Sequence, residues 1–332
     1  MTPFAYTRAG DVAEAVRAIA ADPGARFIAG GTNLIDLMKE NVARPSRLVD
    51  ITRLPLDRIE DIEGGGLRIG ALATNTQVAY DARIEKHYPL LSRAILAGAS
   101  AQLRNMASVG GNLLQRTRCY YFYDTATPCN KREPGTGCSA ITGFNRIHAV
   151  LGASESCVAT HPSDMCVALA ALDATVRVTG AHGERVIPFA DFHRLPGDRP
   201  ELDSNLGADE LVTAVDLPAE GFAAHHAYLK IRDRRSYAFA LVSVAAAVAM
   251  DDGRIAKARV ALGGVAHKPW RDGEAEAMLQ GSVPGRGRFA AMADALLRGA
   301  TGLGHNDFKI GLAKRAVIRA LSHATRAGQT SA

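Results

Sequence analysis

The sequence predicts an α+β protein, and three observations support this fold class. Residues 26–51 contain a strand, a glycine turn, a helix and a second strand, which is a compact βαβ unit. Residues 175–188 contain two short strand patterns joined by a hairpin turn. Residues 239–263 contain two long apolar strands, and two amphipathic helices follow them. An α/β unit followed by antiparallel strands and separate helices is typical of the α+β class.

The N-terminal elements follow from capping and periodicity. Asp11 can N-cap a helix, because apolar residues recur at helical spacing over residues 12–19. Residues 26–29 form a short strand, and the turn at residues 30–33 leads into a second helix. Residues 47–51 then form the next strand.

The remaining elements follow in order along the chain. In the middle region the predicted strands are 67–71, 175–179 and 185–188, and the predicted helices are 76–82, 89–98 and 162–172. In the last region the predicted strands 239–249 and 255–263 are joined by Asp-Asp-Gly-Arg, which is a strong hairpin signal. Two amphipathic helices are predicted near 286–299 and 307–322.

Composition and charge exclude several classes of protein. The chain has 332 residues, of which 47% are hydrophobic and 22% charged, as in soluble globular proteins. Its most apolar stretch, residues 238–250, is too short to span a bilayer, so we expect no membrane insertion. The net charge of +5 is scattered along the chain, so we expect no nucleic-acid partner. The N-terminal residues lack the pattern of a signal peptide.

Four of the five cysteines fall between Cys119 and Cys157, in a segment rich in glycine and proline. The gaps between Cys119, Cys129, Cys138 and Cys157 are nine, eight and eighteen residues. A long loop without helical or strand periodicity needs something other than its own core to hold it, and a metal cluster bound by thiolates would do so. Buried apolar cysteines, disulfides, a zinc site and an iron–sulfur site all remain open, because zinc and ferredoxin clusters usually have shorter spacings.

Basic residues outnumber acidic ones in this loop, and we expect that excess to lower the thiol pKa values. The basic residues are Arg116, Arg118, Lys131, Arg132 and Arg146. Cys166 differs from the other four cysteines, because it lies in a predicted apolar helix and is expected to pack in the core. His148, His161 and His267 are isolated in the sequence and are interpreted as structural.

Two glycine turns are candidate ligand loops. Residues 28–34 place two glycines and two small polar residues between a strand and a helix, where backbone N–H groups can bind a pyrophosphate. A tight connecting turn is the alternative interpretation, and the pattern is not the Gly-x-Gly-x-x-Gly of dinucleotide folds. Residues 108–113 form a second such turn, and two loops suit a dinucleotide better than one. Ser163 and Asp164 open the following helix and could simply form its N-cap, although Asp164 could instead bind a ribose hydroxyl.

At several motifs the chain closely resembles the FAD-binding subunits of the xanthine dehydrogenase family of molybdenum hydroxylases. More narrowly it is similar to the medium subunits of periplasmic aldehyde oxidoreductases from enteric bacteria. The motifs lie at residues 27–39, 112–119, 128–132, 159–165, 236–245 and 263–270. The resemblance implies a two-part FAD-binding fold of the vanillyl-alcohol-oxidase type, followed by a C-terminal domain of the CO dehydrogenase flavoprotein type. It implies domains at 1–54, 55–221 and 222–332, with a [4Fe-4S] loop at 115–158.

The resemblance also implies site residues. For FAD they are Arg26, Phe27, Ile28, Ala29, Gly30, Gly31, Thr32, Asn33, Leu34, Ser108, Gly111, Asn112, Asp164 and Lys230. For a [4Fe-4S] cluster, which most of the family lacks, they are Cys119, Cys129, Cys138 and Cys157. No catalytic residue is expected in this chain, because the cofactors supply the chemistry.

The expected partners are a small subunit with two [2Fe-2S] clusters and a large subunit with a molybdenum cofactor. Electrons from aldehyde oxidation would then pass through [2Fe-2S] clusters and FAD to an external acceptor. Since no signal peptide is recognised, a periplasmic location would require export with a partner that carries one; the alternative is cytoplasmic. The alternative functions are a free-standing NADH-dependent flavin reductase and a zinc-stapled, non-enzymatic binding module.

Overall fold

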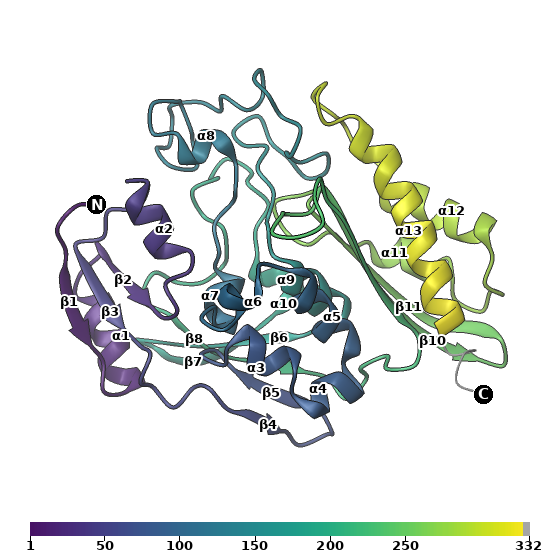
Figure 1. The fold of residues 1–332 in the computed structure, drawn as a ribbon, viewed down its shortest axis with the longest axis horizontal. Helices are drawn as coiled ribbons and strands as arrows, with labels where there is room; N and C mark the ends of the chain where they lie inside the picture. The colour runs from purple at the N-terminus through teal and green to yellow at the C-terminus, as the bar shows by residue number, and fades with distance from the viewer. Residues whose placement is uncertain (328–332) are drawn as a thin grey trace.

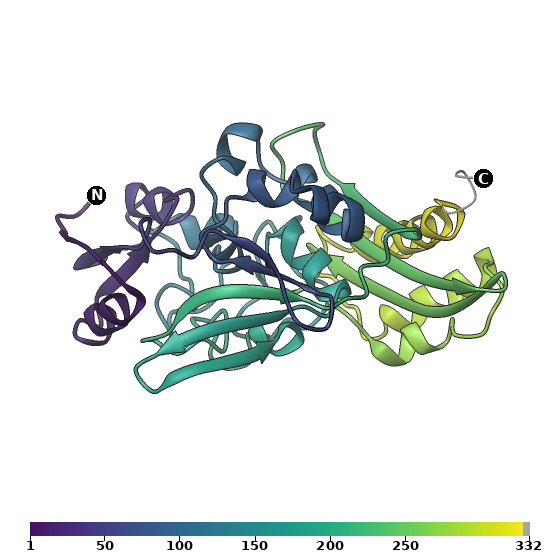
Figure 2. The ribbon, with the colours of Figure 1, turned by 90° about the horizontal axis from the view of Figure 1, so that it is seen from below.

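A computed structural model describes residues 1–327, which form three β-sheets in succession along the long axis of the molecule (Figure 1). The view in Figure 2 shows the same succession from the N-terminal sheet to the C-terminal sheet. Helices accompany each sheet, so the α+β class predicted from the sequence is confirmed. Each sheet packs on its own cluster of buried apolar side chains.

The N-terminal sheet is parallel, with the order β1-β3-β2. Its elements are β1 (Ala5–Arg8), α1 (Val12–Ala20), β2 (Ala25–Ile28), α2 (Leu34–Lys39) and β3 (Arg47–Asp50). Asp11 N-caps α1 as predicted, because its carboxylate accepts a hydrogen bond of 2.7 Å from the Glu14 amide. Strand β1 was not predicted, and it is a largely exposed edge strand with no apolar alternation.

The central sheet is antiparallel, with the order β4-β5-β8-β6-β7. Its strands are β4 (Ile59–Asp61), β5 (Leu67–Gly70), β6 (Thr175–Gly180), β7 (Gly183–Pro188) and β8 (Leu211–Leu217). The predicted strand at 67–71 and the hairpin of β6 and β7 are confirmed, whereas β4 and β8 were missed. Strand β8 carries an apolar, β-branched pattern that is typical of a strand, so the sequence did contain a signal for it.

Short helices lie between β5 and β8 in the chain. They are α3 (Asn75–Ala79), α4 (Ala82–His87), α5 (Pro89–Ala97), α6 (Ala101–Arg104), α7 (Val109–Leu113), α8 (Tyr120–Tyr123), α9 (Asp164–Ala171) and α10 (Phe189–Phe192). Helix α9 is buried at every position and contacts α5 on one side and β10 and β11 on the other. A helix that is apolar on all faces can only be stable inside a core, so α9 joins the central and C-terminal sheets.

The C-terminal sheet is antiparallel, with the order β11-β10-β9. Its elements are β9 (His226–Ile231), β10 (Val242–Asp251), β11 (Arg254–Gly263), α11 (Gly273–Ala277), α12 (Arg286–Leu296) and α13 (Phe308–Ala327). The predicted hairpin is confirmed, because Asp252 and Gly253 have φ angles of 43° and 71° and form its turn. Helix α13 packs on β9 and β10. Strand β9 was not predicted.

Residues 115–158 form the long loop that the sequence indicates, with α8 as its single helix. The loop lies beside α2 in Figure 1, and Leu37 of α2 packs with its cysteines. Within residues 1–327, no helix combines the length and the apolar character needed to cross a membrane.

The burial of three histidines allows us to predict how the free energy of unfolding depends on pH. His193, His226 and His267 are at least nine-tenths buried, and this burial lowers each imidazole pKa from 6.5 to about 4. Between those two values the unfolded chain binds more protons than the folded chain, so acid favours unfolding. We expect stability to be full above about pH 6.5 and to fall as the pH approaches about 4.

Urea denaturation across that range measures the effect. A His226→Gln variant, which cannot titrate there, should show a flatter dependence of the unfolding free energy on pH than the wild-type chain. A wild-type midpoint that stays constant or rises on acidification would contradict the prediction.

Candidate functional site

Two clefts run along the interior edges of the three sheets and meet each other. The larger, of about 950 Å³, is lined by the β2–α2 turn and by residues around Ser108. The smaller, of about 670 Å³, is lined by the start of α9, by Lys230 of β9 and by the loop that precedes β10. Thr32, Asn33 and Gly111 line both clefts, so the two form one continuous site. Each volume lies within the range of roughly 300–1,000 Å³ that is typical of ligand pockets.

The first glycine turn is shaped by close approach of backbone to backbone. A Cβ on Gly30 would lie 1.7 Å from the carbonyl oxygen of Met106, so only glycine lets these two loops touch. Gly31 has a φ of 72°, which favours glycine strongly. The side chain of Asn33 accepts a hydrogen bond of 2.9 Å from the Arg116 amide. The first turn is therefore tied to the second turn and to the start of the cysteine loop.

The second glycine turn is organised by polar side chains. Ser108 N-caps the short helix α7, and its hydroxyl accepts a hydrogen bond of 3.2 Å from the Gly111 amide. The side-chain oxygen of Asn112 accepts from the Ser163 hydroxyl at 2.6 Å and from the Gln115 amide at 2.7 Å. These bonds hold the turn against the start of α9.

Asp164 and Lys230 form a buried ion pair at the wall of the smaller cleft. The Lys230 ammonium donates to Asp164 Oδ2 at 2.8 Å and to the Ala97 carbonyl at 3.1 Å, and Tyr228 donates to Asp164 Oδ1 at 2.6 Å. The two charged side chains are 7% and 4% exposed. Ser163 N-caps α9, so the N-cap interpretation is confirmed for Ser163 and wrong for Asp164.

Every residue predicted from the sequence to contact FAD lines one of the two clefts. Residues 26–34 and Ser108 line the larger cleft, Asn112, Asp164 and Lys230 line the smaller one, and Gly111 lines both. The Nδ2 atom of Asn33 is buried and has no hydrogen-bond partner among the described residues. A polar ligand group in the shared part of the clefts would provide that partner.

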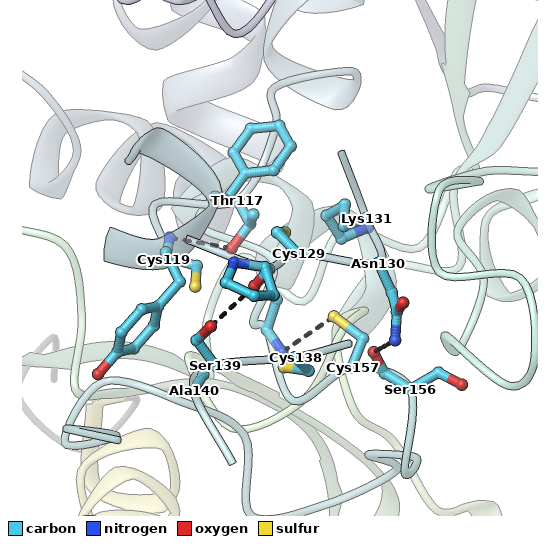
Figure 3. Close-up of a pocket in the computed structure, with 14 residues that line it drawn as sticks. Thr117, Cys119, Cys129, Asn130, Lys131, Cys138, Ser139, Ala140, Ser156 and Cys157 are labelled. Atoms are coloured by element: carbon cyan, nitrogen blue, oxygen red, sulfur yellow. Dashed lines mark hydrogen bonds between the residues drawn. The ribbon is translucent and has the colours of Figure 1, made fainter. Parts of the chain in front are cut away.

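The four clustered cysteines meet in a separate small pocket (Figure 3). Cys119, Cys129 and Cys157 are buried and Cys138 is half-buried, and all four thiols are free. Thr117, Lys131 and Ala140 also line this pocket. Cys166 is absent from the pocket and lies in the core on α9, as the sequence predicted.

Local hydrogen bonds bring these cysteines together. Cys129 and Cys138 form an isolated antiparallel β-bridge, and Asn130 closes the turn between them through both its backbone and its side chain. Cys157 lies in a tight turn that Ser154 closes. Cys119 precedes α8, and its amide donates to the Thr117 hydroxyl at 3.3 Å. The pocket therefore depends on three separate parts of the loop.

The predicted lowering of the thiol pKa values is wrong for two of the cysteines. Burial raises the pKa of the Cys119 thiol to about 12. Burial also raises the pKa of Cys157 to about 11, although the Lys131 ammonium opposes this effect. Burial outweighs the effect of the basic side chains, which also pair with other groups in the loop and around it.

Each of these basic side chains has acidic or carbonyl partners. Lys131 and Arg116 pair with Asp203, whose carboxyl pKa lies well below its usual range despite its burial, because these two cations lie beside it. The Arg132 guanidinium donates to the carbonyls of Tyr121 and Phe122 at 2.8 and 3.0 Å. Arg118 pairs with Asp36 of α2, and Arg146 pairs with Asp233.

The structure adds one residue that sequence reasoning interpreted only as structural. The His148 imidazole is buried, and its Nε2 atom lies 3.0 Å from the Cys119 sulfur. The two residues are 29 positions apart in an irregular loop, so no periodic pattern in the sequence could pair them. His161 and His193 also lie together, with the Nε2 atom of each at 3.4 and 2.8 Å from the Leu113 carbonyl.

Comparisons with known proteins agree with this geometry. The family model described as the FAD binding domain in molybdopterin dehydrogenase matches residues 2–220. The model of the CO dehydrogenase flavoprotein C-terminal domain matches residues 227–324. The aldehyde oxidoreductase FAD-binding subunit PaoB of Escherichia coli is 52% identical, over 98% of this chain and 99% of that protein. The glyceraldehyde dehydrogenase medium chain of Sulfolobus acidocaldarius is 29% identical, over 82% of this chain and 79% of its own length.

Solved structures share the whole fold. A chain of quinoline 2-oxidoreductase from Pseudomonas putida superposes with a TM-score of 0.75 at 26% identity, covering 98% of both chains. A chain of carbon monoxide dehydrogenase from Hydrogenophaga pseudoflava superposes with a TM-score of 0.76 at 25% identity, also covering 98% of both chains.

Proposed function

This chain belongs to the family of FAD-binding subunits of molybdopterin dehydrogenases, and from this membership we propose that it is the electron-transfer subunit of a molybdenum-dependent aldehyde oxidoreductase. The 52% identity to an aldehyde oxidoreductase subunit along almost the whole chain is the observation that supports this reaction. Bound FAD supplies the redox chemistry, in which electrons from aldehyde oxidation are received and passed to an external acceptor. The chain itself supplies binding, orientation and electrostatics.

The two clefts indicate how the chain would hold FAD. Residues 26–34, with backbone N–H groups at the start of α2, would bind the pyrophosphate. Ser108, Gly111 and Asn112 would form the second flavin loop. The ion pair of Asp164 and Lys230 would lie at the end of the site between the central and C-terminal sheets. The unpartnered Asn33 amide where the clefts meet supports a polar ligand there.

The same proposal includes a [4Fe-4S] cluster bound by Cys119, Cys129, Cys138 and Cys157. Its support is that these four free thiols, and not Cys166, line one buried pocket. Four cysteine sulfurs are the ligand set that such clusters require. The raised thiol pKa values of Cys119 and Cys157 mean that metal binding must displace protons there, so loading would be pH-dependent.

We further propose that the chain works in a heterotrimer with a small [2Fe-2S] subunit and a large molybdenum-cofactor subunit. The relatives are named as medium chains or FAD-binding subunits, which supports a multi-subunit assembly. They give no support to a free-standing flavin reductase or to a zinc-stapled binding module. The proposed division at 1–54, 55–221 and 222–332 places one sheet in each part.

The test of flavin binding is a substitution in the first glycine turn. Gly31→Val would force a β-branched residue into a left-handed conformation beside the cleft, at a cost of about 1–3 kcal/mol. We expect flavin binding to weaken about tenfold or more, which flavin absorbance per protein after purification measures. Gly64→Val is the matched control, because Gly64 has a φ of 88° with nothing within 4 Å of its added Cβ. Equal flavin content in both variants would refute the proposed role of the turn.

The test of the cluster compares single cysteine variants. Cys129→Ser and Cys138→Ser should lose most of their iron and acid-labile sulfide and should loosen the loop, because cluster binding and loop order are coupled. Cys166→Ala should keep its iron, since its side chain lies in the core. Iron, zinc and sulfide analysis of each purified protein measures these outcomes. Zinc without iron in the wild-type chain, or iron loss in Cys166→Ala alone, would overturn the assignment.

The proposed location is the periplasm, reached by export together with a signal-bearing partner. Fractionating cells that express this chain with and without the small subunit tests the proposal. We expect periplasmic recovery of this chain only when the small subunit is present. Accumulation of this chain alone in the periplasm would contradict co-export, and retention of the complete complex in the cytoplasm would contradict the location.

A further inference from the structure

His148 occupies an unusual position beside the cysteine pocket. Its side chain is 1% exposed, and Nε2 lies 3.0 Å from the Cys119 sulfur. The other ring nitrogen, Nδ1, has no hydrogen-bond partner among the described residues. A neutral imidazole carries one proton, on either Nε2 or Nδ1.

Whether Cys119 is a thiol or a thiolate decides which ring nitrogen of His148 carries the proton. A free thiol could donate its own proton to Nε2. A cysteine that ligates a metal is a thiolate and can only accept. With the pocket loaded, the imidazole must therefore carry its proton on Nε2 and donate it to sulfur.

We propose that His148 donates a hydrogen bond to the ligating sulfur of Cys119 and thereby raises the reduction potential of the cluster. This inference rests on the proposed [4Fe-4S] site. A hydrogen bond to a ligand sulfur withdraws negative charge, and it stabilises the more negatively charged reduced state more than the oxidised state. The bond is buried, so water neither competes with it nor screens it.

The C-terminal unit fixes the imidazole in place. The His148 carbonyl accepts from Lys309 Nζ at 2.7 Å and from Asn306 Nδ2 at 3.3 Å. Lys309 is fully buried on α13, also donates to the carbonyls of Ile147 and Gly264, and has no carboxylate among its hydrogen-bond partners. The Tyr120 and Tyr121 rings flank the imidazole, with centroids at 6.4 and 6.2 Å. The donor is thus held rigidly toward the sulfur.

The experiment is a redox titration of the assembled complex, monitored by the electron paramagnetic resonance signal of the reduced [4Fe-4S] cluster. His148→Phe removes the donor and keeps a ring, and His148→Gln keeps an N–H donor near the Nε2 position. The matched control is His226→Phe, which alters another buried neutral histidine on β9, outside the cysteine pocket. Iron content is measured for every protein.

We expect His148→Phe to retain iron and to shift the reduced-to-oxidised ratio at a fixed potential about tenfold toward the oxidised form. For a one-electron couple this corresponds to a midpoint lower by about 59 mV. His148→Gln should recover most of the shift, and His226→Phe should show none. A normal midpoint in iron-loaded His148→Phe would overturn the inference while leaving the cluster assignment intact.

The remaining outcomes are also decisive. If His148→Phe loses its iron, a loaded His148→Gln with a midpoint near that of the wild type still supports the inference. Loss of iron from both variants would instead assign His148 a purely structural role and overturn the inference. A wild-type complex without iron in this chain would refute the proposed cluster, which is a separate failure.

Discussion

The arrangement of the two clefts depends on one buried ion pair, that of Asp164 and Lys230. Removing two charges from water costs several kcal/mol per ion, and only close partners can offset that cost. Here the partners come from α9, β9 and the end of α5. The ion pair therefore forms only when α5 and α9 of the central region pack against β9 of the C-terminal sheet in this one arrangement. Helix α9, which is buried at every position and apolar after Asp164, supplies the hydrophobic contact between the same two sheets.

The cysteine loop depends on other contacts for its order, because it has almost no regular structure of its own. Ordering each of its residues costs roughly 1–2 kcal/mol of backbone entropy. Its basic side chains offset part of this cost by binding α2, Asp203 and several carbonyls. These contacts place the loop, whereas the four sulfurs meet in a small pocket in which burial raises the thiol pKa values of Cys119 and Cys157. A bound metal cluster would add its own binding free energy to these contacts and so further stabilise the ordered loop.

Local signals in the sequence predicted the elements that depend on local chemistry. The Asp11 cap, the Asp-Asp-Gly-Arg hairpin and the apolar helix α9 are examples, since each depends on neighbouring residues alone. Strands β1 and β4 were missed because they are short, largely exposed edge strands without an apolar alternation. The sequence could not pair Asp164 with Lys230, which lies 66 residues away. A count of local charges also gave the wrong direction for the thiol pKa values of Cys119 and Cys157, because it ignores burial.

The contact between Gly30 and Met106 bears on how long a ligand stays bound. Backbone touching backbone leaves no side chain that could rotate to widen or narrow the cleft, so the two loops keep one spacing whether or not a ligand is present. A site that is already ordered loses little conformational entropy when a ligand binds. The tighter binding that results appears mainly as slower dissociation of the ligand. Such a site suits a prosthetic group that remains through many turnovers better than a co-substrate that must leave after each one.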